Sequence, residues 1–403
     1  MTGRPLHAAV LPPGERLRGL LADALAGDGP ALSPLDPDLP PARLRGLLEV
    51  LAPSAVITAE GVTPRAGGRA TGAGTALVIV TSGSTGEPKA AELSAAALLA
   101  SARATLARIG ARPGERWLCC LPTGHIAGLQ VLIRSLVAHT VPLICAPADT
   151  SAIAAAAAGL TGCAHLSVVP TQLRRLLDRG CDLTGPRTIL VGGAAPPTGL
   201  LADARAAGAR VITTYGMTET CGGCVYDGTP LDGVEVGTGP DGRIRIAGPV
   251  LFSGYRLRHD LTAAAFEDGW FVTSDLGGIG PDGRVRVRGR ADDVITTGGE
   301  KVAPAEVAAC LEAHPAVREA VVFGLPDPEW GERVTAVVVP ADRGNAPDLA
   351  SLRIHVAGLL PPFAAPRRLI IAADIPLLPS GKADIAALRV RVREQSSDSS
   401  VST

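Results

Sequence analysis

A loop rich in glycine and hydroxyl-bearing residues is the first part of this sequence that could do chemistry. It occupies residues 81–89, reads Thr-Ser-Gly-Ser-Thr-Gly-Glu-Pro-Lys, and follows an apolar stretch that predicts a buried strand. Its N–H and hydroxyl groups would let phosphate oxygens approach the backbone closely, and Lys89 adds a positive charge. The spacing is not that of the nucleoside-triphosphatase P-loop. A flexible surface turn has a similar composition, but the strand before the loop and the lysine after it favour a phosphate site. The candidate phosphate-binding residues are Thr81, Ser82, Gly83, Ser84, Thr85, Gly86 and Lys89.

This loop resembles the phosphate loop of the acyl-adenylate-forming superfamily, which includes acyl-CoA synthetases, luciferases and the adenylation domains of peptide synthetases. Later segments resemble further motifs of that family, in the family's order: an adenylate and magnesium motif at 215–220, a ribose-binding motif at 274–277, a hinge at 289–293 with its following loop at 298–301, and a segment with a catalytic lysine at 379–382. The ribose motif has Ser274 where the family usually has glycine. The resemblance extends from residue 75 to about residue 390, and chance does not explain so many motifs in one order.

The chemistry of this family explains the residue types. Attack of a carboxylate on the α-phosphate of ATP brings two anions together and expels pyrophosphate, so the site must neutralise charge and hold the groups in line. The resemblance implies that Thr218 bonds the α-phosphate, that Glu219 holds Mg²⁺, and that Lys382 reaches the α-phosphate region in this step. Lys382 taken alone could equally be a solvated surface charge, but its place among the ordered motifs favours the catalytic role.

The base and sugar of the nucleotide have their own candidates. The resemblance implies that Asp275 accepts both ribose hydroxyls, that Arg290 helps to hold the nucleotide, and that Tyr215 lies against adenine. Gly193 and Gly216, at the ends of two predicted strands, complete the set that binds ATP and AMP. Asp275 alone could be a turn residue. The implied cofactor is Mg²⁺, with ATP and CoA as co-substrates.

Two segments bear on the acid that is activated. Residues 121–134, with the pattern Leu-Pro-x-x-His-Ile-x-Gly-Leu-x-x-Leu-x-Arg, and residues 215–234 resemble the o-succinylbenzoate–CoA ligase branch of the family, which acts in menaquinone biosynthesis. The acid of that branch has an aliphatic and an aromatic carboxylate, and the one that is not activated must not be buried without a partner. Arg134, at the far end of a helix that His125 begins, could pair with it. Alternatively, His125 is an ordinary helix-start residue and Arg134 forms a surface salt bridge.

The expected reaction is therefore the formation of o-succinylbenzoyl-CoA, AMP and diphosphate from o-succinylbenzoate, ATP and CoA. Three alternatives stay open: a ligase for another aryl or short acyl acid, an adenylating enzyme that loads a carrier protein, and a non-catalytic nucleotide-binding relative. The presence of Lys382, Glu219 and Asp275 argues against the last alternative, because a relic would be free to lose them.

A pair of cysteines directly follows the candidate magnesium ligand, in the segment Cys221-Gly222-Gly223-Cys224. Such a pair can be a redox motif or half of a zinc site, but no second Cys or His pair follows at the spacing of a zinc finger. We interpret the segment instead as small residues that leave room for an aromatic acyl group, with Cys221 and Gly222 in the acid pocket.

One active site must serve two reactions with different nucleophiles. The resemblance implies that a C-terminal domain rotates about Asp292 between the two steps, so that the loop with Gly298 and Gly299 replaces Lys382 and lines a channel for CoA. Paired glycines allow a thin ligand to approach the backbone, and a hinge needs only a few residues at a domain junction. Alternatively, Asp292 only caps the linker or forms a salt bridge in it.

The elements that must position these residues alternate between strands and helices. From residue 54 to residue 216, short apolar strands alternate with helices, including one at 94–109 that Ser94 caps and one at 126–138. This pattern predicts mostly parallel sheets with covered faces. Beyond it, Asp-Gly turns at 241–242 and 282–283 precede alternating runs, which are typical of antiparallel hairpins.

The predicted fold class is therefore α/β with two domains. Residues 1–290 are expected to form a large N-terminal AMP-binding domain of mixed sheets flanked by helices, with a small β-barrel-like subdomain. Residues 291–393 are expected to form a small mobile C-terminal α/β domain, and the polar residues 394–403 a disordered tail. The phosphate loop begins early in the chain, so the N-terminal lobe is short and could gain cover from a second copy in a homodimer.

Composition narrows the class of protein. The chain has 403 residues, of which 46% are apolar, and this is enough for two cores. A net charge of −1 argues against binding to nucleic acid or to an anionic membrane. The N-terminal residues show no signal-peptide pattern, and the apolar runs are too short to span a bilayer. Eight cysteines without the pattern of a disulfide scaffold are typical of a reducing cytoplasm.

Overall fold

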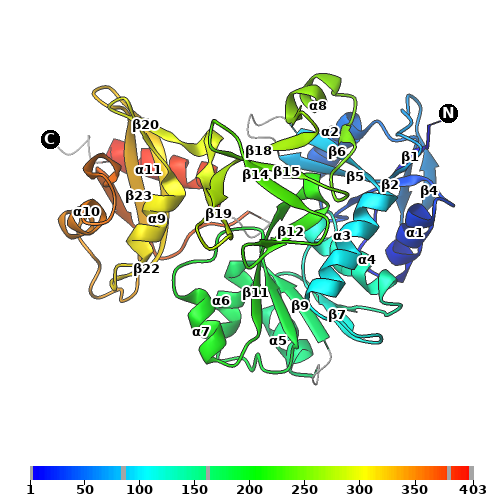
Figure 1. The fold of residues 1–403 in the computed structure, drawn as a ribbon, viewed down its shortest axis with the longest axis horizontal. Helices are drawn as coiled ribbons and strands as arrows, with labels where there is room; N and C mark the ends of the chain where they lie inside the picture. The colour runs from blue at the N-terminus through cyan, green and yellow to red at the C-terminus, as the bar shows by residue number, and fades with distance from the viewer. Residues whose placement is uncertain (1–2, 83–87, 160–163, 379–382, 399–403) are drawn as a thin grey trace.

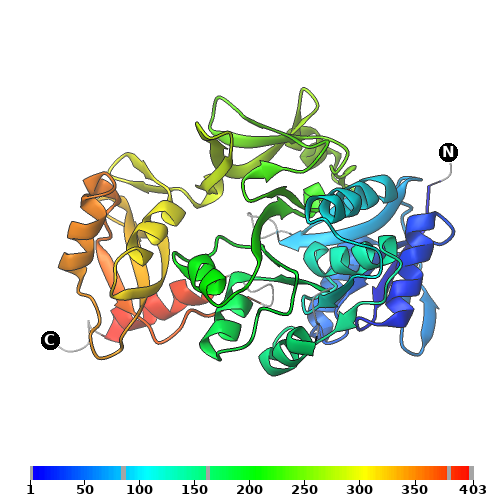
Figure 2. The ribbon, with the colours of Figure 1, turned by 60° about the horizontal axis from the view of Figure 1, so that its bottom comes forward.

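The computed structural model describes residues 3–82, 88–159, 164–378 and 383–398. Their strands form four sheets with helices packed on them, which confirms the predicted mixed α/β class. Figures 1 and 2 show the fourth sheet and its helices on one side of the molecule, beside the part that contains the other three sheets.

The first sheet carries the predicted phosphate loop at the end of a central strand. Its seven strands run in the order β16-β6-β5-β2-β1-β3-β4. Strands β5, β2, β1 and β3 pair in parallel, while β6, β16 and β4 add antiparallel edges. Residues 76–79 of β5 are all buried, as expected for a strand whose two faces are covered. The strands are β1 (Leu6–Val10), β2 (Ala31–Leu35), β3 (Ala55–Thr58), β4 (Gly61–Pro64), β5 (Thr75–Ser82), β6 (Pro88–Ser94) and β16 (Gly254–Tyr255), and the helices of this region are α1 (Glu15–Ala26), α2 (Pro41–Leu51) and α3 (Ala95–Arg108).

The second sheet also has seven strands, in the order β13-β12-β11-β10-β9-β7-β8. From β8 to β11 all neighbours are parallel, and β12 and β13 turn back antiparallel. The parallel part follows from the predicted alternation of strands and helices. The strands are β7 (Arg116–Cys119), β8 (Leu143–Ile144), β9 (Ala164–Val168), β10 (Thr188–Val191), β11 (Val211–Met217), β12 (Gly222–Tyr226) and β13 (Thr229–Pro230), and the helices are α4 (Ile126–Val137), α5 (Thr150–Gly159), α6 (Pro170–Asp178) and α7 (Leu200–Ala206).

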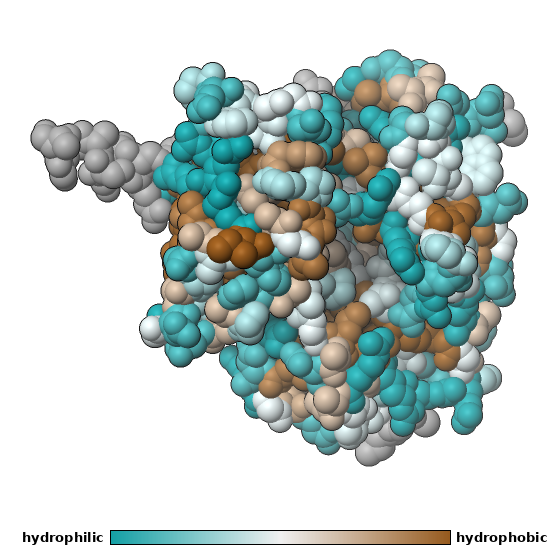
Figure 3. All heavy atoms as spheres, turned by 60° about the vertical axis from the view of Figure 1, so that its left-hand side comes forward, coloured by the Kyte–Doolittle hydropathy of each residue, from teal (hydrophilic) through white to brown (hydrophobic). Residues whose placement is uncertain are grey.

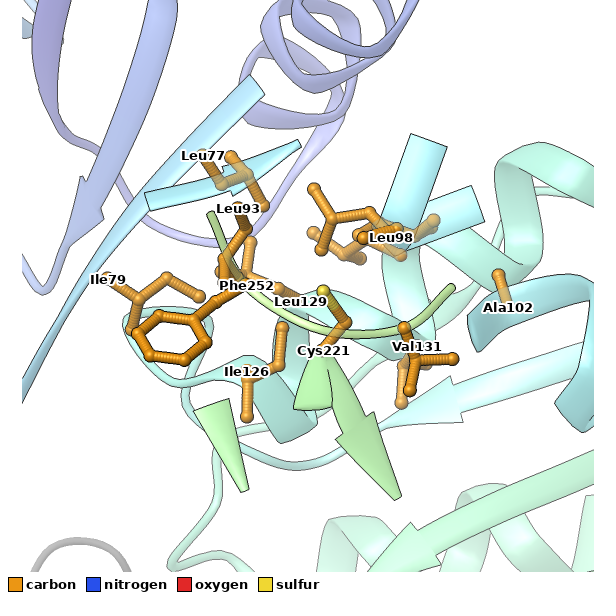
Figure 4. Packing of buried hydrophobic residues seen from close by; sticks show 14 of the residues in the cluster. Leu77, Ile79, Leu93, Leu98, Ala102, Ile126, Leu129, Val131, Cys221 and Phe252 are labelled. Atoms are coloured by element: carbon orange, nitrogen blue, oxygen red, sulfur yellow. The ribbon is translucent and has the colours of Figure 1, made fainter. Parts of the chain in front are cut away.

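The largest core joins these two sheets through α3 and α4. Figure 4 shows leucines of β5, β6, α3 and α4 gathered around Cys221 and Phe252. Ser94 caps α3 as predicted, because its hydroxyl accepts a hydrogen bond from the backbone N–H of Ala97 at 3.1 Å. Packing in this core fixes both helices between the sheets. One face of α4 is directed toward the site described below.

The third and fourth sheets complete the fold. The third has five antiparallel strands and corresponds to the expected barrel-like part; they are β14 (Glu235–Thr238), β15 (Arg243–Ala247), β17 (Phe266–Glu267), β18 (Trp270–Ile279) and β19 (Val285–Arg290), with α8 (His259–Ala265) before β17. The fourth contains β20 (Ile295–Thr297), β21 (Glu300–Val302), β22 (Val317–Asp327), β23 (Gly331–Pro340) and β24 (Arg368–Ile371), with the helices α9 (Pro304–Glu312), α10 (Leu349–Ala357) and α11 (Ile385–Asp398). Three short 3₁₀ turns occur in the described ranges, namely η1 (Thr218–Thr220), η2 (Ala291–Asp293) and η3 (Pro362–Ala364).

Two parts of the chain differ from expectation. The predicted disordered tail is too long, because α11 continues to Asp398 and residues 394–398 are helical. A helix already formed adds each further residue at little cost, and Arg393, Glu394 and Gln395 are good helix formers. Residues 6–51, for which no elements were predicted, supply two strands of the first sheet and the helices α1 and α2.

The surface offers no extended apolar face in the view of Figure 3, where hydrophobic residues lie in small groups among hydrophilic ones. None of the helices in the described ranges has the length and hydropathy needed to cross a membrane.

Candidate active site

A cavity of about 510 Å³ is lined by residues of the first three sheets and of α4 and α8. Several of its lining residues lie at or just after the carboxyl ends of strands, such as Thr81 in β5, Gly193 after β10 and Thr218 after β11. Ligands commonly bind at this edge of α/β sheets. The fold thus brings together residues that are distant in sequence at the place where a ligand is expected.

The phosphate-loop end of the cavity is formed by β5 and β6. Thr81 and Lys89 both line the cavity and are cross-strand partners, and the Thr81 hydroxyl donates to the Lys89 carbonyl at 3.3 Å. Ser82 ends β5. The other predicted loop residues, Gly83, Ser84, Thr85 and Gly86, lie outside the described residues.

The predicted magnesium ligand lies on a 3₁₀ turn that follows β11. Thr218 and Glu219 both line the cavity, and the turn ends at Cys221, which takes a left-handed conformation with φ of 53°. Tyr255 donates its hydroxyl to Glu219 Oε1 at 2.9 Å. Burial raises the pKa of Tyr255, and the Glu219 charge raises it further, so the phenol stays protonated and remains a donor.

The donor set around Glu219 fits Mg²⁺. Within the described ranges, no group of three or more His, Cys, Asp and Glu residues could hold a metal ion. A single hard carboxylate facing a cavity is nevertheless a common arrangement for Mg²⁺, which takes its remaining ligands from substrate phosphates and water.

The predicted ribose ligand is held by a cross-strand pair and by a tyrosine. Asp275 in β18 pairs with Arg290 in β19, and Arg290 Nη1 lies 3.4 Å from Asp275 Oδ1. Tyr215 donates its hydroxyl to Asp275 Oδ2 at 2.7 Å. Asp275 and Arg290 line the cavity, whereas Tyr215 is not among the lining residues. The structure therefore places the Tyr215 hydroxyl on the predicted ribose ligand, where the sequence suggested only a contact with adenine.

Glycine is required where β11 and β12 approach each other. A side chain at Gly216 would place its Cβ 2.1 Å from the carbonyl oxygen of Gly222, so neither strand could stay in place. Gly222 itself has φ of 105°, and both residues line the cavity. The two predicted glycines thus let β11 and β12 lie close together and form part of the cavity wall.

One face of α4 forms the part of the cavity wall that carries residues predicted to bind the acid. Ile126, Gln130 and Arg134 are spaced four residues apart, and all three line the cavity together with the helix N-cap His125. The spacing confirms that His125 begins a helix that presents Arg134 at its far end. Gln130, which the sequence analysis missed, donates its amide to the Cys221 carbonyl at 2.7 Å and ties α4 to the wall.

Arg134 is buried rather than exposed, which rules out the alternative of a surface salt bridge. Arg134 is 4% exposed, and it forms no ion pair with any of the described residues. Its Nη2 lies 3.4 Å from the hydroxyl of Tyr226, and its Nε is buried without a hydrogen-bond partner in the described structure. Burial lowers the pKa of Arg134, because the charged form is deprived of water. A buried charge without an acidic partner is costly, so the site is suited to an anionic ligand.

The cysteine pair does not serve the cavity. Cys221 is fully buried in the main core, and its side chain points there among leucines in Figure 4. The expectation that Cys221 faces the acid is therefore wrong: its left-handed turn directs the side chain to the core, and the next residue, Gly222, lines the cavity instead. Burial raises the pKa of both thiols, that of Cys224 to about 12, so they are not reactive at neutral pH.

The chain has three tyrosines, and each places its hydroxyl on a different charged residue of the cavity. Tyr255 contacts Glu219, Tyr215 contacts Asp275 and Tyr226 contacts Arg134. The three tyrosine hydroxyls therefore contact three different charged side chains of the cavity lining.

Comparison with known proteins shows which family the chain matches. The family described as AMP-binding enzyme matches residues 66–240, and the AMP-binding enzyme C-terminal domain matches residues 306–382. The probable 2-succinylbenzoate–CoA ligase of Mycobacterium tuberculosis is 46% identical over 323 residues, which cover 78% of this chain and 83% of that protein. This chain belongs to the AMP-binding enzyme family.

Solved structures of similar fold include a synthetase and a second protein, both with bound ligands. The o-succinylbenzoate CoA synthetase of Bacillus subtilis, in complex with the acyl-adenylate intermediate OSB-AMP, has a TM-score of 0.79 and 26% identity, and the match covers 94% of this chain and 87% of that chain. That synthetase has also been solved with ATP and magnesium ion. ATP-bound MatB from Rhodopseudomonas palustris has a TM-score of 0.83 and 27% identity over 97% of this chain and 89% of that chain.

In this AMP-binding enzyme, the predicted hinge and CoA-channel residues lie away from the cavity wall. Asp292, Gly298 and Gly299 are not among the lining residues. The two glycines have φ of 58° and 84° in the turn between β20 and β21. Leu378, by contrast, lines the cavity, and it directly precedes the residues 379–382, which lie outside the described residues and include Lys382.

Proposed function

We propose that this AMP-binding enzyme activates 2-succinylbenzoate with ATP and transfers the acyl group to coenzyme A. Its Mycobacterium tuberculosis relative is named for that ligase activity, and the Bacillus subtilis synthetase of the same fold was solved with OSB-AMP. The observation that carries the choice of acid is the buried guanidinium of Arg134, which lines the cavity without an acidic partner among the described residues. A monocarboxylic acid would leave this charge unpaired after binding, whereas a dicarboxylic acid supplies the missing anion.

In the first step, an oxygen of one substrate carboxylate attacks the α-phosphorus of ATP. An O–P bond forms, the bond from the α-phosphorus to the bridging oxygen breaks, and pyrophosphate leaves with both electrons of that bond. Thr81, Lys89 and Thr218, which line the cavity, would hold the phosphates, and Asp275, which also lines it, would accept the ribose hydroxyls. Lys382 supplies the charge that offsets the two anions in the transition state. Mg²⁺, held by Glu219, would neutralise part of the phosphate charge.

In the second step, the CoA thiol loses its proton to solvent and the thiolate attacks the acyl carbon. A C–S bond forms, the bond from that carbon to the phosphate oxygen breaks, and AMP leaves with both electrons of that bond. The two nucleophiles cannot share one approach, so we propose two domains, residues 1–290 and 291–393, with rotation about Asp292 between the steps. Gly298 and Gly299 would then replace Lys382 beside the cavity. The glycine turn supports this assignment because its lack of side chains would leave room for the pantetheine arm of CoA.

The decisive experiment is mass detection of the CoA thioester formed from ATP, Mg²⁺, CoA and 2-succinylbenzoate. We expect the thioester to appear with stoichiometric AMP. Matched reactions use 4-oxo-4-phenylbutanoate, which lacks the aromatic carboxylate, and benzoate. Efficient turnover of either control acid with none of 2-succinylbenzoate would overturn the proposed substrate in favour of another aryl acid ligase. Adenylate formation without CoA transfer would favour a carrier-protein-loading enzyme.

We further propose that the enzyme acts in the cytoplasm as a homodimer. ATP and CoA are available there, and the seven cysteines in the described ranges are all free thiols, as a reducing compartment keeps them. Sedimentation of the purified protein tests the assembly, with a single species of about 82 kDa expected for two chains of 40.9 kDa.

A further inference from the structure

Two aromatic residues contact the guanidinium of Arg134. The Trp117 ring of β7 lies under the guanidinium, with its centroid 5.1 Å from Cζ. The Tyr226 hydroxyl of β12 lies 3.4 Å from Nη2 and 2.9 Å from Thr105 Oγ1. Since a phenol has one proton and two lone pairs, Tyr226 can donate to Thr105 and accept from Arg134. Both contacts are attractive to a cation, and neither carries a charge.

Resting on the proposed function, we infer that Trp117 and Tyr226 are positioning residues that hold the Arg134 charge in the cavity wall without neutralising it, and that this makes the enzyme selective for dicarboxylic acids. A carboxylate in either place would also fix Arg134 but would cancel its charge. The incoming second carboxylate of the substrate would then have to displace an internal anion.

Glu115, an acidic residue near Trp117 in the sequence, is paired with residues other than Arg134. Glu115 is buried, accepts from His165 Nε2 at 2.9 Å and forms an ion pair with Arg187. Trp117 lies against His165 with ring centroids 4.9 Å apart, and the two residues are register partners on β7 and β9. The order across the layer is therefore Arg187, Glu115, His165, Trp117 and Arg134. The Glu115 charge is balanced at one end of this row, and the Arg134 charge is left for the cavity at the other.

Burial keeps the row in this charge state. His165 is fully buried, and the loss of water lowers its pKa, while the bond to Glu115 acts in the opposite direction. A neutral His165 adds no repulsion to Arg134 through the Trp117 ring. The Nε of Arg134 and the hydroxyl of Ser167 both belong to cavity-lining residues, and both are buried without a hydrogen-bond partner in the described structure.

The test compares variants of the two aromatic residues with two acids. Tyr226→Phe removes only the hydroxyl, Trp117→Phe keeps a ring, and Trp117→Leu removes it. We expect KM for 2-succinylbenzoate to rise roughly 3- to 10-fold in Tyr226→Phe and more in Trp117→Leu, since each removes one contact to a charged group. The rise should be smaller in Trp117→Phe than in Trp117→Leu, because phenylalanine keeps a ring beside the guanidinium. KM for ATP and for 4-oxo-4-phenylbutanoate should stay within about twofold. The ratio of kcat/KM between the two acids therefore falls toward one.

A merely structural role predicts a different result. Loss of packing would raise KM for both acids by one factor or lower kcat for both, and either outcome in Tyr226→Phe overturns the inference. If Trp117→Leu does not fold, Tyr226→Phe and Trp117→Phe still decide the question. The proposed function is tested separately by the parent enzyme: failure to form 2-succinylbenzoyl-CoA overturns it whatever the variants do, and an unchanged acid ratio in the variants overturns only the inference.

Discussion

Arg134→Met should weaken acid binding and stabilise the protein at the same time. Methionine matches the length of the arginine stem and is apolar, so it removes the charge while filling most of the space. Arg134 is 4% exposed, so almost all of its interaction with a bound carboxylate takes place away from water. A hydrogen bond to a charged group contributes about 1.5–3 kcal/mol, which corresponds to a rise of roughly 10- to 150-fold in KM for 2-succinylbenzoate.

The gain in stability follows from the same burial. Removing an ion from water costs several kcal/mol, and the protein offsets part of that cost through the Trp117 ring and the Tyr226 hydroxyl. Those two contacts contribute about 2 kcal/mol and about 1 kcal/mol respectively. The remainder suggests that Arg134→Met raises the free energy of unfolding by roughly 1–2 kcal/mol, or the melting temperature by roughly 1–2 °C for a chain of 403 residues.

Two measurements check this prediction on the same protein. Steady-state kinetics gives KM for 2-succinylbenzoate, 4-oxo-4-phenylbutanoate and ATP, and thermal melting without ligand gives stability. Arg134→Lys is the matched control, because it keeps a charge but loses the planar group that lies on Trp117. A melting temperature that falls in Arg134→Met, together with equal losses for both acids, would refute the reasoning and make Arg134 a structural residue.

The other predictions concern the nucleotide end and the domain junction. Lys382→Ala should nearly abolish acyl-adenylate formation but spare thioester formation from presynthesised acyl-adenylate, because the lysine stabilises the first transition state only; equal losses in both half-reactions would contradict this. Tyr255→Phe should raise the Mg²⁺ concentration for half-maximal activity roughly threefold to tenfold, the contribution of one hydrogen bond, and leave KM for the acid unchanged. Asp292→Pro fixes one backbone dihedral angle and should slow CoA transfer far more than adenylation in rapid-quench measurements of the two steps. If both steps slow by the same factor, Asp292 instead stabilises the linker, since its Oδ2 lies 3.5 Å from Nη2 of Arg290.

The sequence could predict the residues that lie on regular periods and at strand ends. The local pattern alone predicts Ser94 and the helix after it, the four-residue spacing that carries Arg134, and strands that end within one or two residues of Thr81 and Thr218. Each of these features depends mainly on residues that are close in the chain, so the sequence alone indicates it.

Contacts between distant segments could not be predicted in the same way. Tyr226 reaches Arg134 across 92 residues, and Tyr215 reaches Asp275 across 60 residues. Nothing near any of these residues in the chain indicates its partner. The direction of Cys221 was also hidden, because it depends on one backbone angle of 53°, which a non-glycine residue seldom adopts.

Because the hydroxyls of all three tyrosines contact charged cavity residues, labelled tyrosines could report ligand binding. Biosynthetic incorporation of 3-fluorotyrosine would give a ¹⁹F spectrum with one resonance for each of Tyr215, Tyr226 and Tyr255. Nucleotide, acid and metal could then be followed as separate signals in one titration, since each phenol lies on a different charged group. The order in which the three resonances shift would report the order in which the substrates bind.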